Sequence, residues 1–383
     1  MQRRQFLQNT FAGALGLAAV GQARSLLAQA PVAATPNAAT PNAAVPASQL
    51  RGVNLGAWLL LEKWMTPRVF RDTNAPDEYE LCRALGARAA QRLNEHRETF
   101  ITAEDFRWIK ARGLNAVRLP VGYWALEAPA PYVQATRFVD FAFEQAQKNG
   151  LKVVLDLHGA PGSQNAWDHS GRSGTLGWHT DPQNIRQSLR VLETFAQRYG
   201  KHPALYGIEL LNEPRWDVPI ATLKTFYQDA YGRIRRHAGE RIAIVFHDAF
   251  RPMEWKGFMT GPQYANVLLD THLYQAYTDE DRKRTIPQHV AVALDRKNQI
   301  EAMGRPPATI VGEWSIALPG EVWRNQSPFQ ISVGKRAYGD AQLLSYETSK
   351  GWFYWSYKLE DQNTDWNFRH CVEQGKLPGN FAA

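Results

Sequence analysis

The stretch KVVLDLH, residues 152–158, reads as a β-strand that is buried on both faces and ends in polar groups. Apolar side chains, two of them β-branched, fill the run up to Asp156, and His158 closes it. Strands of this kind are typical of parallel sheets that are covered by helices. The stretch therefore predicts an α/β fold whose strands carry reactive side chains at their carboxyl ends.

Similar runs recur seven more times, with helical segments between them. The strand-like runs are Gly52–Leu55, Ala116–Leu119, Leu205–Leu211, Ile242–Phe246, Val267–Leu273, Thr309–Val311 and Gly351–Trp355. Segments with apolar residues at helical spacing are Ala103–Arg112, Ala135–Asn149, Asn184–Tyr199, Ala221–Ala238 and Ile286–Met303. A doubly wound sheet shows a similar alternation, but no G-x-G-x-x-G follows the first strand. Eight strands in this order predict a single (β/α)8 TIM barrel with enlarged βα loops.

Composition narrows the class of protein further. The chain has 383 residues, 44% hydrophobic and 21% charged, which is ordinary for a globular protein. The formal charge of +7 falls partly on arginines near the N-terminus, and no basic run indicates a nucleic-acid partner. Cys82 and Cys371 are too few for a disulfide framework or a multi-cysteine metal site. They can form one bridge or remain two free buried thiols.

Residues 1–30 are interpreted as a twin-arginine-type signal peptide. Arg3 and Arg4 precede the apolar run 11–20, and Ala28-Gln29-Ala30 supplies a small-x-small cleavage site. The run is too short for a permanent membrane span. The motif lacks the usual flanking residues, so the ordinary secretory route stays open. Either route predicts an exported protein, periplasmic or extracellular.

Residues 31–49, rich in Ala, Pro, Thr and Asn, predict a disordered linker, because such a stretch cannot bury enough surface to order itself. The folded domain is expected over residues 50–383. No repeat or heptad suggests an oligomer, so we expect a monomer.

Polar residues cluster where the predicted strands end. They are Arg118, Asp156, His158, Asn212, Glu213, His247, Asp248, His272, Tyr274, Glu313 and Trp355. The carboxyl ends of barrel strands surround one cavity, so these side chains should converge. Glu213 and Glu313 then form the pair of carboxylates that cleavage of a glycosidic bond requires. Since two close carboxylates do not both ionise cheaply, we expect Glu213 to be protonated and Glu313 to be held ionised by Arg118 and Tyr274.

At these residues the sequence resembles glycoside hydrolase family 5, whose members are retaining enzymes on a (β/α)8 barrel. LNEP at 211–214 and VGEW at 311–314 match its acid/base and nucleophile signatures. Further stretches are similar to its fungal exo-β-1,3-glucanase branch: GVNLGAWL (52–59), VRLPVGYW (117–124), DLHGAPGSQN (156–165), HDAF (247–250) and WFYWSYK (352–358). The resemblance covers nearly everything from Arg51 to Lys358.

The resemblance implies roles by position. Glu213 would be the acid/base and Glu313 the nucleophile, with neither metal nor cofactor. The implied substrate-binding residues are Arg118, His158, Asn212, His272, Tyr274, Trp355, Glu62 and Trp167. Among them, Asn212 would bind the 2-hydroxyl, Trp355 would lie under the reacting sugar, and Glu62 would hold the terminal glucose. Trp167 stands where the branch has an entrance Phe. A surface ion pair for Glu62 and a packing role for Trp167 stay open.

The expected function is that of a retaining β-glucan hydrolase resembling glucan β-1,3-glucosidases. The segment between Glu313 and Trp355 is shorter than in the fungal enzymes, which can open the pocket into a groove. An endo-acting β-glucanase or cellulase, or a transglycosylase, therefore stays an alternative. Two other classes are a metal-dependent hydrolase that uses His158, His247 and His272, and a noncatalytic carbohydrate-binding barrel.

Overall fold

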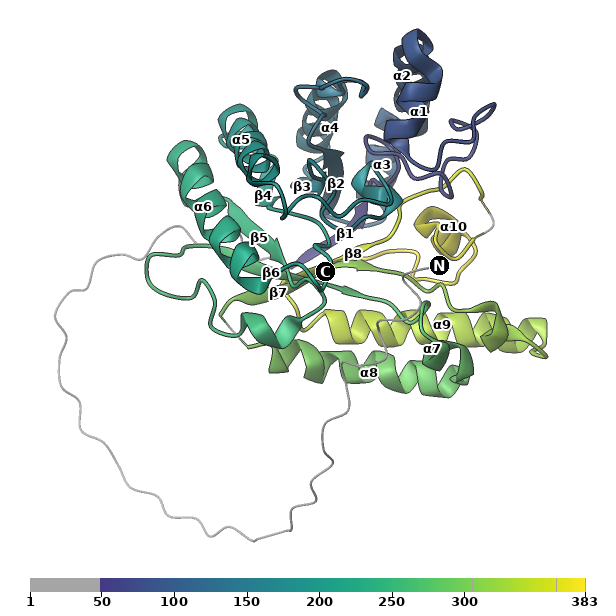
Figure 1. Cartoon of the computed structure of the whole chain (residues 1–383). Helices are drawn as coiled ribbons and strands as arrows, with labels where there is room; N and C mark the ends of the chain where they lie inside the picture. Colours follow the sequence, from purple (N-terminus) through teal and green to yellow (C-terminus); the bar gives the residue numbers. More distant parts are fainter. Residues whose placement is uncertain (1–48, 305, 363, 383) are drawn as a thin grey trace, which may run out of the picture.

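The computed structural model describes residues 49–304, 306–362 and 364–382 (Figure 1). The predicted signal peptide and nearly all of the predicted linker lie outside these residues. Eight parallel strands form a closed barrel in sequence order, and β1 pairs with β8. They are β1 (Leu50–Asn54), β2 (Ala116–Gly122), β3 (Lys152–Gly159), β4 (Leu205–Glu209), β5 (Ala243–His247), β6 (Val267–Leu273), β7 (Ala308–Trp314) and β8 (Gly351–Tyr354). The predicted barrel is confirmed.

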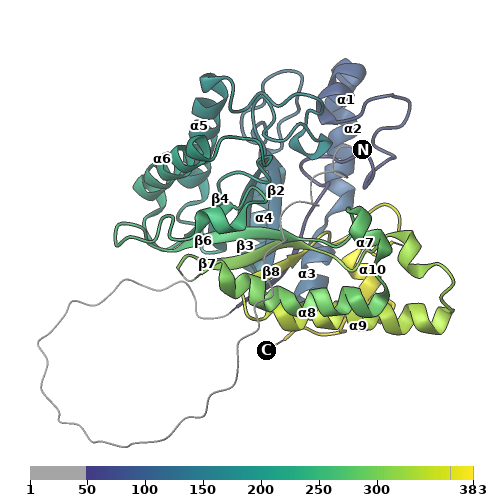
Figure 2. The same ribbon diagram turned by 60° about the horizontal axis from the view of Figure 1, so that its bottom comes forward.

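Helices surround the barrel, and α8 and α9 lie side by side along one flank (Figures 1 and 2). The helices are α1 (Glu78–Leu85), α2 (Ala89–Phe100), α3 (Ala103–Ala111), α4 (Thr136–Lys148), α5 (Pro182–Tyr199), α6 (Ile220–Ala238), α7 (Asp279–Lys283), α8 (Ile286–Ala302), α9 (Pro328–Tyr346) and α10 (Phe368–Glu373). The β5–β6 connection departs from the ideal repeat, because its only helical turn is the short 3₁₀ segment η4 (Pro252–Trp255). In the described part of the chain, no helix has both the length and the hydropathy to cross a membrane.

Local sequence explains where several helices begin. Asp181 accepts a hydrogen bond from the amide of Gln183 and precedes Pro182, so α5 starts with a capped end and a proline in its first turn. Ser327 and Gln330 form a capping box at the start of α9. These caps fix the points at which the long βα loops give way to helices, and so fix the length of the loops around the barrel mouth.

The apolar core has two parts. One large cluster fills the space between the strands and the helices. A smaller cluster fills the lower half of the barrel interior and consists of Leu50, Ala116, Val154, Tyr206, Ala243, Val245, Leu268, Ile310 and Phe353. Since residues two apart on a strand share a face, the next inward positions on these strands lie nearer to the carboxyl ends. The lower cluster therefore supports the polar groups above it.

The structure decides two points of local structure, namely where the fourth strand ends and whether the two cysteines form a bridge. The fourth strand ends at Glu209 rather than at Leu211, so Asn212 and Glu213 belong to the loop that follows. Leu210 still donates its amide to the Val245 carbonyl of β5, and beyond it Glu213 adopts a φ of 41°. That left-handed conformation is costly for a residue with a Cβ and is typical of functional positions. Cys82 and Cys371 are both free and buried, so they form no bridge.

Candidate active site

Glu213 and Glu313 come together at the carboxyl ends of β4 and β7, and both are buried. His272, on β6, lies between them. Its Nδ1 is 2.7 Å from Oε1 of Glu213 and 3.4 Å from Oε2 of Glu313. These two carboxylate oxygens therefore lie no farther apart than the sum of the two distances. The predicted pair of carboxylates is thus one site and not two.

Glu313 accepts hydrogen bonds from two strong donors. Arg118 Nη1 is 3.2 Å from its Oε1, and the Tyr274 hydroxyl donates to its Oε2 at 2.8 Å. Arg118 is fully buried on β2, where it carries a permanent positive charge. The two groups that the sequence assigned to Glu313 are therefore in contact with it.

Arg118 is also the centre of a buried polar network. It makes a bidentate pair with Glu209, at 2.7 and 2.9 Å, and its Nη2 lies 3.0 Å from Asp156 and 2.8 Å from Oδ1 of Asn212. Burial lowers the pKa of Arg118, but Asp156, Glu209 and Glu313 outweigh it and hold that pKa well above its usual value. Burial raises the pKa of Asp156 to about 8, against the lowering effect of Arg118. The network fixes Arg118, and through it the orientation of Glu313 and Asn212.

His272 is held on its far side by Asp270, whose Oδ2 lies 3.2 Å from its Nε2. Burial lowers the pKa of His272, but Glu313 and Asp270 outweigh it, so that pKa lies well above its ordinary value. Asp270 also accepts the Gly312 amide at 2.6 Å, and a Cβ at Gly312 would meet its carboxylate at 2.1 Å. The glycine before Glu313 is therefore required for Asp270 to approach and orient His272.

His158 is neutral and has a defined tautomer. Its Nδ1 lies 2.7 Å from Asp156, and its Nε2 lies 3.4 Å from the Asn212 amide nitrogen. Burial, followed by the charge of Arg118, lowers the pKa of His158 to about 3. The ring therefore donates from Nδ1 and accepts at Nε2. It also stacks on Trp355, with ring centroids 5.5 Å apart and planes 7° apart, and so fixes the orientation of that indole.

A cleft opens over the carboxylates. It is lined by Glu62, Trp64, His158, His169, Glu213, Tyr274, Tyr277, Glu313 and Trp355. Glu62 is only 5% exposed and accepts a hydrogen bond from Trp64 Nε1 at 2.7 Å, so it is a buried side chain of the cleft wall. Of the remaining predicted residues, Arg118, Asn212 and His272 lie behind the cleft as buried supports.

Trp167 is a predicted residue that lies outside the set lining the cleft. It is partly buried and packs against the rings of His169, Trp216 and Phe250, with centroids 5.4, 5.9 and 6.0 Å away. His169 in turn lies 3.4 Å from Oε2 of Glu213. Trp167 therefore belongs to an aromatic cluster at the side of the cleft, one contact removed from Glu213.

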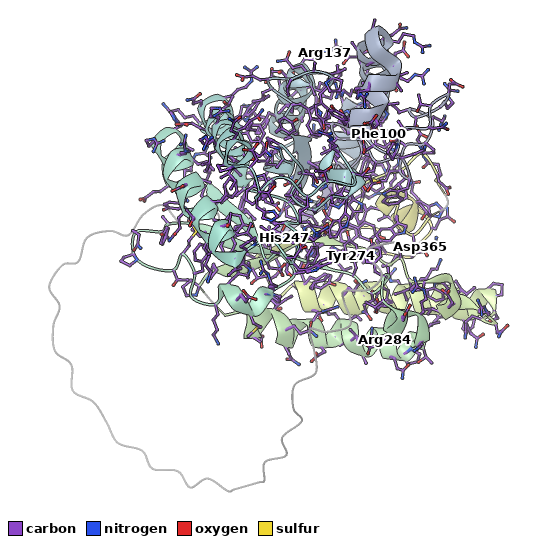
Figure 3. All side chains as sticks on the ribbon, in the orientation of Figure 1. Phe100, Arg137, His247, Tyr274, Arg284 and Asp365 are labelled. Carbon is purple, nitrogen blue, oxygen red and sulfur yellow. The ribbon has the colours of Figure 1, made fainter. Side chains whose placement is uncertain are left out.

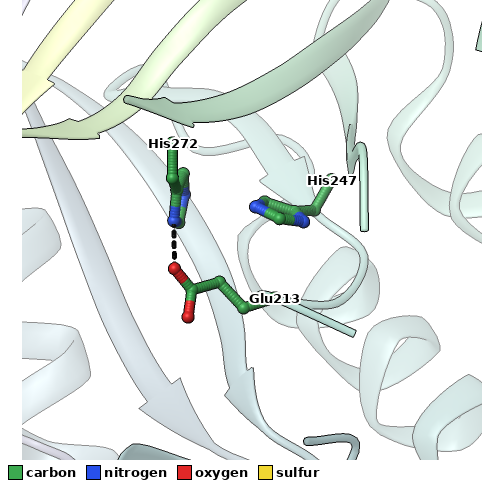
Figure 4. A group of neighbouring side chains, drawn as sticks. All are labelled: Glu213, His247 and His272. Atoms are coloured by element: carbon green, nitrogen blue, oxygen red, sulfur yellow. Dashed lines mark hydrogen bonds and ion pairs between the residues drawn. The ribbon is translucent and has the colours of Figure 1, made fainter. Parts of the chain in front are cut away.

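Glu213, His247 and His272 lie close enough to suggest a metal site, since one donor atom from each is within 4.8 Å of the others (Figure 4). Their hydrogen bonds do not fit a metal. The Ala249 amide donates to His247 Nδ1 at 2.9 Å, so His247 carries its proton on Nε2. Both nitrogens of His272 face carboxylates. Histidine ligands offer a lone pair to the metal, which neither ring presents here.

The second candidate metal group consists of Glu209, Asp270 and His272. Both oxygens of Glu209 are already engaged by Arg118. The donor chemistry of both groups therefore argues against the metal-dependent alternative.

Figure 3 places His247 and Tyr274 toward the middle of the molecule, whereas Arg137 and Arg284 lie near its outer helices.

Sequence reasoning missed Glu209, Asp270, His169 and Trp216. Glu209 and Asp270 lie within strand runs that otherwise read as apolar, and that position is the signal that could have identified them. A carboxylate in the middle of a strand buried on both faces must have a buried partner. His169 and Trp216 belong to loops, and no periodic pattern marks them.

The fold and the site together define a class: a (β/α)8 barrel with two carboxylates at the carboxyl ends of its strands. The family model "Cellulase (glycosyl hydrolase family 5)" matches residues 86–360. The chain is 38% identical to glucan 1,3-beta-glucosidase of Blumeria graminis, over 86% of this chain and 87% of that protein. It is 32% identical to glucan 1,3-beta-glucosidase 1 of Schizosaccharomyces pombe, over 88% and 89%.

Solved structures agree on the fold. Rutinosidase from Aspergillus niger superposes with a TM-score of 0.75 at 20% identity, covering 88% of this chain and 99% of that one. Endoglucanase Cel5A from Thermotoga maritima superposes with a TM-score of 0.54 at 19% identity, covering 80% and 89%. The chain belongs to glycosyl hydrolase family 5 and is a glycosidase.

Proposed function

We propose that the protein is a retaining β-glucan hydrolase of the glucan β-1,3-glucosidase type. The observation that carries the proposal is the sharing of His272 Nδ1 by the two carboxylates, at 2.7 and 3.4 Å. Even the sum of these distances is below the separation of about 6.5 Å at which inverting pairs begin, and retaining pairs lie about 5 to 5.5 Å apart. This short spacing favours direct attack by Glu313 over attack by an intervening water.

The reaction has two steps. In the first, Glu213 gives a proton to the glycosidic oxygen while Glu313 attacks the anomeric carbon, so the glycosidic bond breaks and a glycosyl ester forms. In the second, Glu213 takes a proton from water, whose oxygen attacks the same carbon and releases Glu313. Esterification removes the charge of Glu313, so Glu213 can act first as acid and then as base.

The other residues bind and orient the sugar. Asn212 accepts from Arg118 through Oδ1, its amide nitrogen lies 3.4 Å from His158 Nε2, and we assign to this amide the bond to the 2-hydroxyl. Trp355, stacked on His158, provides a flat apolar surface for the reacting ring. Glu62 is placed to accept from hydroxyls of the terminal sugar, and Trp167 contributes an aromatic face farther out.

Product analysis tests the linkage and the mode of cleavage. The names of the curated relatives support β-1,3-glucan as the substrate. We expect the purified enzyme to degrade laminarin faster than cellulose, lichenan or pustulan, and to release glucose that NMR first detects as the β-anomer. Cellulose cleaved faster than laminarin, or α-glucose appearing first, contradicts the proposal.

Endo cleavage or transglycosylation is the second candidate within the family. The segment between Glu313 and Trp355 is shorter than in the fungal enzymes that the sequence resembles, and it contains η5 (Gly320–Trp323) and α9. A short loop favours an open groove over a blind pocket. Early release of laminari-oligosaccharides from laminarin identifies endo action, and products longer than the added oligosaccharide identify transfer.

Two measurements test the two other functional classes, a metal-dependent hydrolase and a noncatalytic carbohydrate-binding barrel. The donor chemistry of the histidines leads us to expect full activity after dialysis against EDTA, and loss of activity that zinc restores indicates a metal-dependent hydrolase. Turnover of an aryl β-glucoside separates an enzyme from a noncatalytic carbohydrate-binding barrel. No turnover of any β-glucoside or β-glucan means that the proposed activity is wrong.

We also propose export by the twin-arginine-type signal of residues 1–30, a linker over 31–49, and a monomeric catalytic domain over 50–383. Support comes from the arginine pair and from the polar, proline-rich composition of the linker. Gln49 donates hydrogen bonds to the Tyr346 and Ser349 carbonyls, which supports a catalytic domain that starts close to residue 50. A chain that starts at Gln49 should retain the melting temperature of the longer protein and elute as a monomer.

A further inference from the structure

The loop that follows β1 brings Glu62 to the cleft without regular secondary structure. Residues 55–66, which we call the β1 loop, form neither strand nor helix, yet most of them are buried. Glu62 lines the cleft over the carboxylates. On its carboxyl side, the Glu62 carbonyl accepts from the amides of Met65 and Thr66, at 3.0 and 3.1 Å. On its amino side, the loop is held by residues of α1 and α2.

Glu78, the first residue of α1, binds the backbone directly before Glu62. Its Oε2 accepts the Leu61 amide at 2.8 Å. Its Oε1 accepts from Trp124 Nε1 at 3.0 Å and lies 3.4 Å from Arg97 Nη2. Three donors thus converge on one side chain, and a carboxylate offers two acceptor oxygens with no donor of its own. A glutamine at this position would turn its NH₂ group toward at least one of these donors.

Arg97, on α2, balances the charge of Glu78. Both side chains are fully buried. Burial raises the pKa of Glu78, and the charge of Arg97 opposes that rise. Arg97 also donates to the carbonyls of Gln134 and Val133, at 3.1 and 3.2 Å, which fix its guanidinium. Because a buried charge without a partner is strongly destabilising, Arg97 allows a carboxylate to stand where the Leu61 amide needs an acceptor.

Helix α2 holds the start of the β1 loop at two further points. His96 Nε2 lies 2.8 Å from the Ala57 carbonyl, and burial lowers the pKa of His96 to about 4. The neutral ring therefore donates to that carbonyl. Trp58 Nε1 donates to the Arg97 carbonyl at 2.8 Å. The part of the loop before Glu62 is thus attached to α1 and α2 at three places.

We propose that Glu78 and Arg97 are positioning residues that hold Glu62 against the sugar in the cleft, and that they act through the Leu61 amide. The proposal rests on the proposed function, in which Glu62 accepts from hydroxyls of the terminal sugar. Glu78 and Arg97 are fully buried and lie outside the set that lines the cleft. A side chain binds a ligand best when its backbone is already fixed, because ordering it on binding costs affinity. The buried ion pair therefore serves the affinity for the sugar.

A double-mutant cycle tests this role. Glu78→Gln is made in wild type and in Glu62→Ala, and kcat and KM are measured on an aryl β-glucoside. In wild type we expect kcat/KM to fall about tenfold, mainly through KM, because Glu62 contacts hydroxyls and not the reacting bond. In Glu62→Ala the same change should alter kcat/KM less than about twofold. Equal losses in both backgrounds mean that Glu78 only supports the fold, and they overturn the proposal.

Glu193→Gln on α5 is the matched control. Three donors also converge on this carboxylate, from Arg233, Arg236 and His237 of α6, and none of these residues lines the cleft. The variant should keep the wild-type kcat/KM for the aryl β-glucoside. A loss equal to that of Glu78→Gln would reflect a general weakening of the fold and overturns the proposal.

A second variant keeps the test decisive if Glu78→Gln fails to fold with Arg97 unpaired. Glu78→Met combined with Arg97→Met replaces a buried ion pair by apolar side chains, a change that proteins often tolerate. It also removes the acceptor of the Leu61 amide. We expect the same rise in KM and the same dependence on Glu62, and melting temperatures establish folding. A KM equal to wild type in this double variant overturns the proposal.

Hydrogen exchange separates failure of this role from failure of the proposed function. Mass spectrometry follows peptides that cover residues 55–66. The Leu61 amide should exchange at least about tenfold faster in Glu78→Gln than in wild type, and no faster in Glu193→Gln. An unchanged exchange rate overturns the positioning role even if wild type hydrolyses the glucoside. Absence of turnover by wild type on every β-glucoside overturns the proposed function, and with it the role given to Glu62 and its supports.

Discussion

The two halves of the barrel interior differ although the same strands build them. On β2, Ala116 lies in the lower apolar cluster and Arg118, two residues on, lies in the polar network. On β3, Val154 and Asp156 show the same change. Both halves are fully buried at these positions. Burial alone therefore does not determine whether an inward-facing position is apolar or charged. The position along the strand, near or far from its carboxyl end, determines it.

The apolar lower half stabilises the fold. The upper half holds the reactive side chains, whose burial costs free energy. Apolar side chains gain free energy when they leave water, by about 25 cal/mol per Å². The upper half instead buries Asp156, Glu209 and Glu313 around Arg118 and Asp270 beside His272, and removal of charges from water is expensive even when they are paired. Such a network is retained for its function, and the lower half offsets its cost. Variants can separate the two halves.

The largest effect is expected for Glu313. Glu313→Ala or Glu313→Gln should lower kcat by at least about 10⁴-fold, because the covalent intermediate can no longer form. Azide should partly restore activity to the Ala variant and yield an α-glycosyl azide, since a small anion fits the vacated space. An unchanged melting temperature controls for folding. Wild-type turnover in either variant removes Glu313 from the mechanism.

Substitution of Glu213 should lower the rate of hydrolysis less than substitution of Glu313, and the loss should depend on the substrate. Glu213→Ala should slow hydrolysis of laminarin by about 10² to 10⁴-fold, the usual value of general acid–base catalysis. A dinitrophenyl glucoside needs no proton for departure, so its first step should stay fast and the glycosyl-enzyme should accumulate. Rapid-quench mass spectrometry detects that species. Equal losses on both substrates contradict the acid role.

A change in the lower half should affect stability without affecting chemistry. Leu268→Ala leaves a cavity in the lower cluster and should reduce the free energy of unfolding by about 2 to 5 kcal/mol. At temperatures where the variant is folded, kcat/KM should stay close to the wild-type value. Urea unfolding and steady-state kinetics measure the two quantities. A fall in kcat larger than tenfold shows that the two halves are coupled.

The residue two positions farther along the same strand should behave in the opposite way. Asp270→Asn keeps the shape but removes a charge that raises the pKa of His272. That pKa should fall, so the alkaline limb of the kcat profile should move to lower pH, and kcat at neutral pH should drop about 10 to 100-fold. The melting temperature should change little. A pH profile identical to wild type means that Asp270 only supports Gly312.

The sequence was sufficient for the barrel and for the convergence of the two glutamates, because both depend on local patterns. Apolar runs of strand length, with polar residues at their ends, place Arg118, Glu213 and Glu313 on one face of the barrel whatever the exact register. No helical segment was predicted between β5 and β6, and η4 with its loop takes up that connection.

The contacts within the site needed the three-dimensional structure. The β6–β7 register shifts between Thr271 and His272, so His272 pairs with Glu313 rather than with Gly312. Strand alternation alone does not predict such a shift. It is also what lets Asp270 reach the Gly312 amide. Positions in the βα loops, such as His169, are set by tertiary packing. The sequence therefore placed Trp167 at the entrance but did not predict its ring contacts with His169, Trp216 and Phe250.

The smallest effect is expected at Trp167, which lies outside both halves of the barrel interior. Trp167→Ala removes one face of the cluster with Trp216 and Phe250 but leaves the contacts of both carboxylates in place. Loss of one stacking contact costs about 1 kcal/mol, so KM for laminari-oligosaccharides should rise about fivefold. KM for an aryl glucoside, which fills only the site at Glu313, should rise much less. Because His169 links Trp167 to Glu213, an equal rise for both substrates would instead show that the indole supports the acid through His169.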